Sequence, residues 1–236
     1  MLRTLLVGLD GTADSDAALE LGIRWARQFD ALLVGLGVVD EPGIHGAEEV
    51  WLGEVYFRQI NEKLTTSAHR QVNRSLERAA IRCAEEGVAF KPLEDVGSPH
   101  ERILIEAQRY DIILMGQRTH FRFGWQDHAD DTLRRVLTEN PRPVVAVQSR
   151  PEVHGESVLV AFDGNVPSAR SLHSFLVSGL AQLGPVHVLC AKHDRLEAAR
   201  HAERAVEFLR FHEIKAQPHA IAATGNPSKL IIEHVR

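Results

Sequence analysis

Two aspartates follow matching apolar runs, and a glycine comes directly after each: Asp10 after residues 4–9 and Asp163 after residues 157–162. A carboxylate at the end of a buried strand can bind a polar group of a ligand. It can equally accept hydrogen bonds from N–H groups of its own turn. Both interpretations of Asp10 stay open at this stage. The repeated pattern itself predicts two copies of one α/β unit.

A polar loop over residues 117–130 carries basic and acidic side chains. Its basic residues are Arg118, His120 and Arg122. They could form an anion site, but we favour a solvated loop. Its acidic end could bind a metal ion, because carboxylates and imidazoles are metal ligands. That end contains Asp127, His128, Asp130 and Asp131. We interpret it instead as an acidic turn that precedes a helix, where negative charge is favourable, and we predict no metal site.

No arrangement of residues in the sequence indicates catalysis. A nucleophile with a base and an orienting group is not recognisable. The chain has neither a Gly-x-Ser-x-Gly elbow nor a lysine after a glycine-rich phosphate loop. The sequence therefore predicts no catalytic residues and makes no positive case for an enzyme.

Short apolar runs that do not alternate predict strands buried on both faces of a parallel sheet. These runs are 4–9, 31–39, 112–115 and 144–147. Helical periodicity separates them, most clearly over 56–86, and Gly87 is a natural stop. Residues 88–96 contain Pro92, which predicts a strand at the edge of the sheet.

Three helix starts have recognisable caps in the sequence. Asp14 or Ser15 can cap the first helix. Ser98, Pro99 and Glu101 form the pattern of a capping box at a later helix. Gly225-Asn226-Pro227 repeats the pattern of Gly97-Ser98-Pro99 in the second copy.

The second copy is shorter than the first. It predicts strands at 158–162, 186–191 and 214–222, with helices at 167–181 and 195–212 and a further helix starting at Pro227. Counterparts of the last two strands of the first copy are missing. We therefore expect the natural chain to continue beyond Arg236.

The bulk composition limits the class of protein. With 44% hydrophobic and 25% charged residues the chain is an ordinary globular one, and its net charge of −5 argues against nucleic-acid binding. The sequence contains no run of 18 apolar residues, so it predicts no membrane span. Cys83 and Cys190 are isolated, as is typical of a reducing compartment, so we expect a cytoplasmic protein.

Taken together, several motifs resemble the universal stress protein family in its tandem form. They are Val7-Gly8-Leu9-Asp10-Gly11-Thr12, Val38-Val39-Asp40, Gly97-Ser98-Pro99, Asp111-Ile112-Ile113-Leu114-Met115-Gly116 and Pro141-Arg142-Pro143-Val144-Val145-Ala146-Val147. The resemblance implies two doubly wound, Rossmann-like units of the adenine-nucleotide-hydrolase type, with parallel strands in the order 3-2-1-4-5. We expect domain 1 at residues 1–148, a linker at 149–156 and an incomplete domain 2 at 157–236.

The same resemblance implies a ligand crevice where the strand order reverses. Gly8, Asp10 and Val38 would contact the adenosine portion of a nucleotide, and Met115 and Gly116 would begin the phosphate loop. Asp163 would be the equivalent position in domain 2.

The phosphate loop departs from the family pattern, which is Gly-x-x-Gly, nine residues, then Gly-Ser or Gly-Thr. Thr119 replaces the second glycine, and nine residues further on lies Ala129. Aligned from the following helix instead, with one inserted residue, the Gly-Ser pair becomes Asp130-Asp131, followed by Thr132. Carboxylates there would repel a triphosphate by about 1 to 4 kcal/mol per charge pair. We therefore expect weak ATP binding or none in domain 1, although Mg²⁺ could bridge the charges.

From this resemblance we expect a protein of stress adaptation that senses or scaffolds through nucleotide-site-containing domains. Two alternatives remain: an ATP-binding universal stress protein with slow ATPase activity, and a purely structural dimerisation module. In this family the fifth strands pair edge to edge across a dimer or between tandem copies. If domain 2 lacks its own fifth strand, the edge at Val144–Val147 implies a homodimer.

Overall fold

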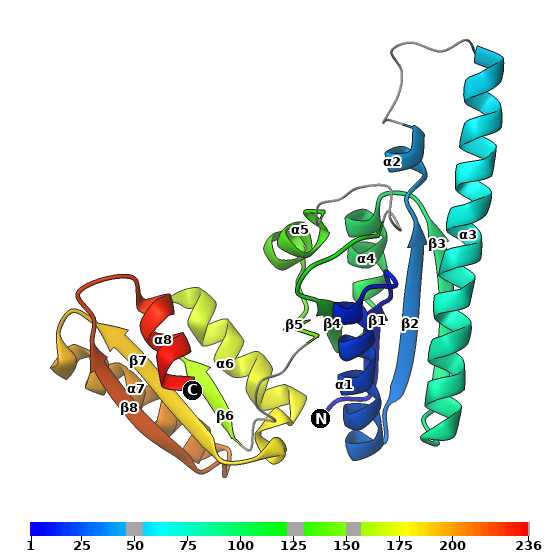
Figure 1. Ribbon diagram of the computed structural model, residues 1–236. Coiled ribbons are helices and arrows are strands. Elements are labelled where there is room, and N and C mark those ends of the chain that lie inside the picture. The colour runs from blue at the N-terminus through cyan, green and yellow to red at the C-terminus, as the bar shows by residue number, and fades with distance from the viewer. Residues whose placement is uncertain (46–53, 122–129, 150–156, 236) are drawn as a thin grey trace. The chain divides into compact units, whose positions relative to one another are not determined.

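The computed structural model describes residues 1–45, 54–121, 130–149 and 157–235 (Figure 1). The chain divides near residue 151 into two compact units, called here the first unit and the second unit. Each unit has its own parallel sheet and its own core, so each can be described by itself.

The first unit alternates strands and helices along the chain. Its elements are β1 (Thr4–Gly8), α1 (Ala13–Phe29), β2 (Leu32–Val39), α2 (Glu41–His45), α3 (Glu54–Glu85), β3 (Phe90–Val96), α4 (Pro99–Ala107), β4 (Ile112–Gly116), α5 (Thr132–Glu139) and β5 (Val144–Val147). The alternation follows from the sequence pattern, because the unbroken apolar runs form strands and the segments with helical periodicity form helices.

All five strands of the first unit are parallel, in the order β3-β2-β1-β4-β5. The predicted order 3-2-1-4-5 is therefore confirmed. The strands β1, β2 and β4 are buried almost throughout, as their unbroken apolar runs predict. β3, which carries Pro92, lies at one edge. Between β1 and β4 the strand order reverses, and this switch point is where a site is expected.

Helices cover the two faces of this sheet (Figure 1). α1 and α3 pack on one face, where Gly37 of β2 leaves room for Val72 of α3. A β-carbon on Gly37 would lie 2.6 Å from Val72 Cγ1, so the missing side chain sets how closely helix and sheet approach.

On the other face lie α4 and α5, which contact each other. A buried cluster joins them to the sheet, and it contains Leu6, Val34, Leu36, Val38, Ile103, Ala107, Tyr110, Ile113, Met115, Phe121 and Val136. Successive residues of a strand alternate between the two faces of the sheet. Leu36 and Val38 of this cluster therefore face the opposite way from Gly37, which lies between them in β2.

Two predicted caps differ from those observed. Thr12, rather than Asp14 or Ser15, caps α1: its hydroxyl oxygen accepts the Ser15 N–H at 3.1 Å. Ser98 occupies the cap position of α4 but makes no side-chain cap bond. Its hydroxyl instead contacts His100 Nδ1 at 2.8 Å, because that imidazole is buried beside it.

The second unit contains β6 (Val158–Ala161), α6 (Val166–Ser178), a 3₁₀ turn (Leu180–Leu183), β7 (Val186–Lys192), α7 (Arg195–Phe211), β8 (Ala216–Ala222) and α8 (Pro227–Val235). Its sheet has the parallel order β6-β7-β8. Thus β6 lies at an edge of the described sheet, whereas β1 lies in the middle of its own. The core of this unit is formed mainly by β7, α7 and Leu172 of α6.

Within the described ranges, no helix combines the length and the apolar character that crossing a membrane requires.

We predict that Gly37→Ala destabilises the first unit by about 1–3 kcal/mol, because the added methyl group overlaps Val72. Urea unfolding followed by tryptophan fluorescence measures this, since Trp25 is buried in α1 of that unit and residues 157–236 contain no tryptophan. Adding Val72→Ala should make room, so the double variant should lose less than the sum of the single losses. Strictly additive losses would contradict the proposed contact.

Candidate functional site

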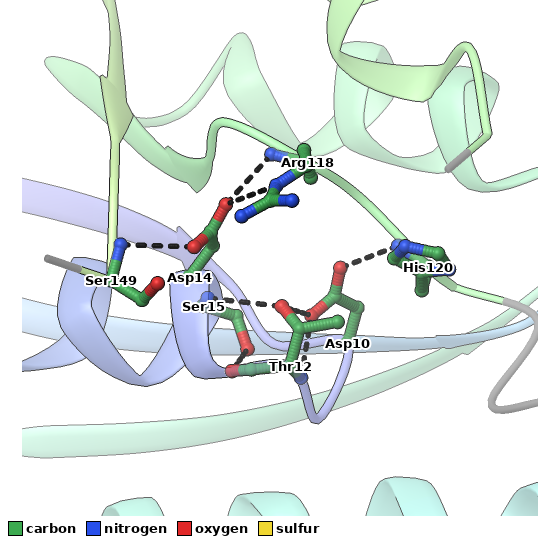
Figure 2. A network of polar contacts seen from close by, with 7 residues as sticks. All are labelled: Asp10, Thr12, Asp14, Ser15, Arg118, His120 and Ser149. Atoms are coloured by element: carbon green, nitrogen blue, oxygen red, sulfur yellow. Dashed lines mark hydrogen bonds and ion pairs between the residues drawn. The ribbon is translucent and has the colours of Figure 1, made fainter. Parts of the chain in front are cut away.

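At the switch point, Asp10 binds its own turn and a distant loop at the same time (Figure 2). Its Oδ1 accepts the Thr12 N–H at 3.0 Å and the Thr12 hydroxyl at 2.6 Å. Its Oδ2 accepts the His120 N–H at 2.7 Å, from the loop that follows β4. The side chain is buried, and the chain itself occupies both oxygens. This geometry supports the structural interpretation of Asp10 over a free ligand contact.

A second buried carboxylate, Asp14, lies four residues further along the chain, in the first turn of α1. It accepts the Arg118 N–H at 3.1 Å and the Ser149 N–H at 2.9 Å, and the Arg118 guanidinium lies 3.6 Å away (Figure 2). Burial alone would raise the pKa of Asp14, but the hydrogen bonds from Ser149 and Arg118 and the guanidinium charge outweigh it, so this pKa is lowered. Asp14 thus connects α1 with the ends of β4 and β5.

Gly116 is the glycine that makes this approach possible. A β-carbon there would lie 2.9 Å from Asp14 Cβ and 3.0 Å from the backbone nitrogen of Ser15. The resemblance implied that Gly116 begins a phosphate loop. In the structure, the end of β4 packs directly on the first turn of α1.

Phe121 occupies the opposite side of the switch point. A β-carbon on Gly8 would lie 3.3 Å from Phe121 Cζ and 3.7 Å from Met115 Cγ. Gly8 thus lies against Phe121 and Met115, and Val38 belongs with these two side chains to one buried cluster. Phe121 is only 1% exposed. Sequence reasoning missed it, and the only available signal was an aromatic residue within a polar loop.

Asp130 holds the loop that carries Phe121. Its carboxylate accepts the Thr119 hydroxyl, the Phe121 N–H at 2.9 Å and the Thr132 N–H at 3.0 Å. The Asp130 N–H in turn donates to the Thr119 carbonyl at 2.9 Å. Three of the four residues of the degenerate phosphate loop therefore form one hydrogen-bonded turn.

Asp131 is different, because it is exposed and pairs with Arg134 at 3.1 Å. It stands at the cap position of α5 without a side-chain cap bond. Arg122, Asp127 and His128, the other charged residues of this loop, lie outside the described residues.

Two cavities adjoin the aspartates that the repeat singled out. The cavity of the first unit, about 780 Å³, lies beside the turn from β1 to α1. It is lined by Asp10, Gly11, Thr12, Gln71, Arg74, Ser75, Glu77, Arg78, Ile81 and His120. The cavity of the second unit, about 420 Å³, is lined in part by Asp163, Ser168 and Lys192.

Asp163 also binds within its own turn. It accepts the Asn165 N–H at 3.1 Å and the Asn165 side-chain amide at 2.6 Å. Burial would raise the pKa of Asp163, but hydrogen bonds from Ser168 and Asn165 and the charge of Lys192 lower it overall. In the described part of the chain, no three or more His, Cys, Asp or Glu side chains are grouped so as to hold a metal ion.

We predict that Asp14→Asn destabilises the first unit by about 1.5–3 kcal/mol near neutral pH, because charge-assisted hydrogen bonds are lost. The lowered pKa of Asp14 means that its contribution is complete well above the ordinary value of 3.8 and is lost as the pH falls through the lower folded pKa. The difference in unfolding free energy between wild type and variant should therefore shrink on acidification.

Asp16→Asn is the matched control, since Asp16 is an exposed carboxylate in the same helical turn. It should change the unfolding free energy by less than about 0.5 kcal/mol. A wild-type advantage over Asp14→Asn that stays constant down to acidic pH would contradict the role assigned to Asp14.

Comparisons with known proteins agree with this architecture. The family model of the Universal stress protein family matches residues 1–148. A universal stress protein from Archaeoglobus fulgidus DSM 4304 is similar in structure, with a TM-score of 0.68 at 18% identity, over 98% of this chain and 80% of that one. The universal stress protein UspA from Lactobacillus plantarum has a TM-score of 0.50 at 17% identity, over 62% of this chain and 97% of that one.

At such low identities the two structures show a shared fold and nothing more. A search of the curated proteins found no match. The family match covers more than half of the sequence and includes every strand of the five-stranded sheet. On these grounds, the chain belongs to the universal stress protein family.

Proposed function

We propose that this protein acts in stress adaptation as a non-catalytic sensor or scaffold, and that its first unit binds ATP weakly or not at all. The observation that carries the proposal is Phe121, which packs against Gly8 where the family would place the adenosine portion of a nucleotide. A nucleotide at that position would have to displace a buried aromatic side chain, and such burial is worth roughly 3 kcal/mol.

The hydrogen bonds of the loop support the same conclusion. A phosphate loop presents free backbone N–H groups to its anion. Here Asp10 takes the N–H of His120, Asp14 that of Arg118 and Asp130 that of Phe121. Carboxylates of the chain thus occupy donors that a phosphate would need. Residues 116–132 contain three aspartates and two arginines, and this excess of negative charge repels a triphosphate as well.

We further propose that the second unit is a second copy of the same domain, in a tandem protein. The two first turns agree bond by bond: Asp163 accepts the Asn165 N–H as Asp10 accepts that of Thr12. Each of these cap residues then accepts the N–H of a serine three residues on, and that serine hydroxyl donates back to the cap carbonyl. Gly11 and Gly164 share a positive φ, 78° and 81°.

Titration with Mg²⁺-ATP distinguishes the weak-binding proposal from the alternative, an ATP-binding protein with slow ATPase activity. Wild-type protein titrated with Mg²⁺-ATP in a calorimeter should show no saturable binding tighter than about 100 μM. A universal stress protein that binds ATP serves as the positive control. Low-micromolar affinity that is lost in Asp10→Ala would contradict the weak-binding proposal and favour the alternative.

A gain of binding tests the loop more directly. The triple variant Thr119→Gly, Asp130→Gly, Asp131→Ser restores the glycines and the serine of the family pattern, with one residue more between them. It also removes two carboxylates, each worth about 1 to 4 kcal/mol of repulsion. We expect its affinity for Mg²⁺-ATP to rise at least about tenfold. Asp131→Ser alone is the control: it leaves the hydrogen bonds of Asp130 in place and should bring little gain. Equal affinity of the triple variant and the wild type would count against the loop as the cause.

We also propose that the protein forms a homodimer through β5. This strand lies at an edge of its sheet, and its three valines are partly exposed. An unpaired edge is a template for another strand.

Light scattering at micromolar concentration should therefore give the mass of a dimer. Ala146→Lys puts a charge on the exposed middle of β5 and should shift the mass toward the monomer. Thr138→Lys adds the same charge on the exposed part of α5 and should not. A wild-type protein that is strictly monomeric under these conditions would exclude this dimer.

A further inference from the structure

Two histidines of the second unit are in direct contact on its sheet. Nδ1 of His187 in β7 lies 3.0 Å from Nε2 of His219 in β8, and the two ring centroids are 5.1 Å apart. In a hydrogen bond between two neutral imidazoles, one of the facing nitrogens carries the proton and the other accepts it. Both residues are partly exposed, so a small ion from the solvent can reach them.

The pair lies on the face of this sheet that is turned away from α7. Val188 and Cys190 of β7 belong to the core cluster that α7 completes. Successive residues of a strand point to opposite faces, so His187 and Leu189 belong to the other face. Leu189 pairs in register with His219, which therefore points the same way. The two histidines share this face with Leu189, which is buried.

The first unit shows what the fold requires at the position of His187. Leu6 of β1 and Leu159 of β6 each lie four residues before the aspartate of their unit. Leu6 pairs in register with Val34, and Leu159 pairs in the same way with His187. Val34 is buried in the core of the first unit. A valine thus fills this position in the same arrangement of strands.

The same comparison holds for the second histidine. Two residues further along β2, Leu36 pairs in register with Leu93. Two residues further along β7, Leu189 pairs with His219. Leu93 packs against the buried cluster of the first unit. Because the fold accepts apolar side chains at both positions, packing does not account for the histidine pair, whereas binding through the imidazoles does.

The two facing nitrogens have the spacing of neighbouring ligands of one metal ion. Histidine nitrogens bind such ions at about 2.0–2.1 Å. Two nitrogens at that distance from one ion and 3.0 Å from each other enclose an angle of about 90–100°. An angle near 90° is that of neighbouring ligands in the square-planar or tetragonal coordination of Cu²⁺ and Ni²⁺. The terminal torsion of histidine is broad, so small rotations of the rings can aim both lone pairs at the ion.

We propose that His187 and His219 bind a divalent transition-metal ion of the Ni²⁺ or Cu²⁺ type. His187 Nδ1 and His219 Nε2 are its ligands. The ring that donates the hydrogen bond gives up that proton and takes one up at its outer nitrogen, so the charge of the pair stays the same. Among the described residues no third histidine, cysteine or acidic side chain joins the pair, so water completes the coordination. The site goes beyond the proposed function, because it uses no residue of the switch point.

The test is calorimetric titration of the full, untagged chain with Ni²⁺ and, for comparison, with Mg²⁺. We expect Ni²⁺ to bind at one site with a dissociation constant below about 100 μM. Mg²⁺ should show no saturable binding, because it prefers oxygen ligands. His187→Val and His219→Leu introduce the side chains that the first unit has at these positions, so both variants should fold. Each should weaken Ni²⁺ binding at least about tenfold, since even an outer partner of a metal ligand contributes that much.

His173→Ala is the matched control, because His173 is an exposed histidine of α6 in the same unit. It should bind Ni²⁺ as the wild type does. Thermal unfolding followed by circular dichroism should show that the variants are folded. Ni²⁺ should raise the unfolding temperature of the wild type and of His173→Ala, but not of His187→Val, because only a bound ion stabilises the native state.

Three results would overturn the proposal. One is the absence of saturable Ni²⁺ binding by the wild type. Another is unchanged Ni²⁺ binding by a folded His187→Val/His219→Leu double variant. The third is Mg²⁺ binding as tight as that of Ni²⁺, which would exclude imidazole ligands. None of the variants alters the loop after β4, so the result is independent of the ATP titration.

Discussion

Two buried carboxylates at the start of α1 hold the switch point together. Asp10 and Asp14 accept backbone N–H groups from three separate segments: the turn before α1, the loop after β4 and the residues after β5. Hydrogen bonds to a charged group contribute about 1.5–3 kcal/mol each. Gly116 allows these segments to approach because it has no side chain to separate them. The position of the loop, and with it the burial of Phe121, depends on this set of contacts.

In open α/β sheets, ligands bind where the strand order reverses. In this chain the same backbone places an aromatic residue against Gly8 and a carboxylate at each of three loop N–H groups. These contacts all come from the loop and the turn, while the sheet beneath has the order β3-β2-β1-β4-β5. The cavity beside α3 lies between that helix and the turn from β1 to α1, with His120 also in its lining. The fold of this protein therefore does not by itself determine what it binds.

The buried parallel strands and the edge position of β3 could be predicted from local signals, whereas the strand order 3-2-1-4-5 came from the resemblance to the family. Unbroken apolar runs indicate buried parallel strands, and Pro92 cannot donate in the middle of a sheet. The role of Asp14 could not be predicted, since its partners Arg118 and Ser149 lie more than 100 residues away. A sequence shows that an aspartate stands near a helix start, but not which distant N–H group it will meet. The same holds for Phe121, whose neighbours Gly8 and Met115 are set by the loop as a whole.

The hydrogen bond from Ser149 to Asp14 places an anchor directly before the segment that leads to the second unit. The same carboxylate also holds the backbone of Arg118. The point where the chain leaves the first unit is therefore fixed both to the first turn of α1 and to the loop after β4.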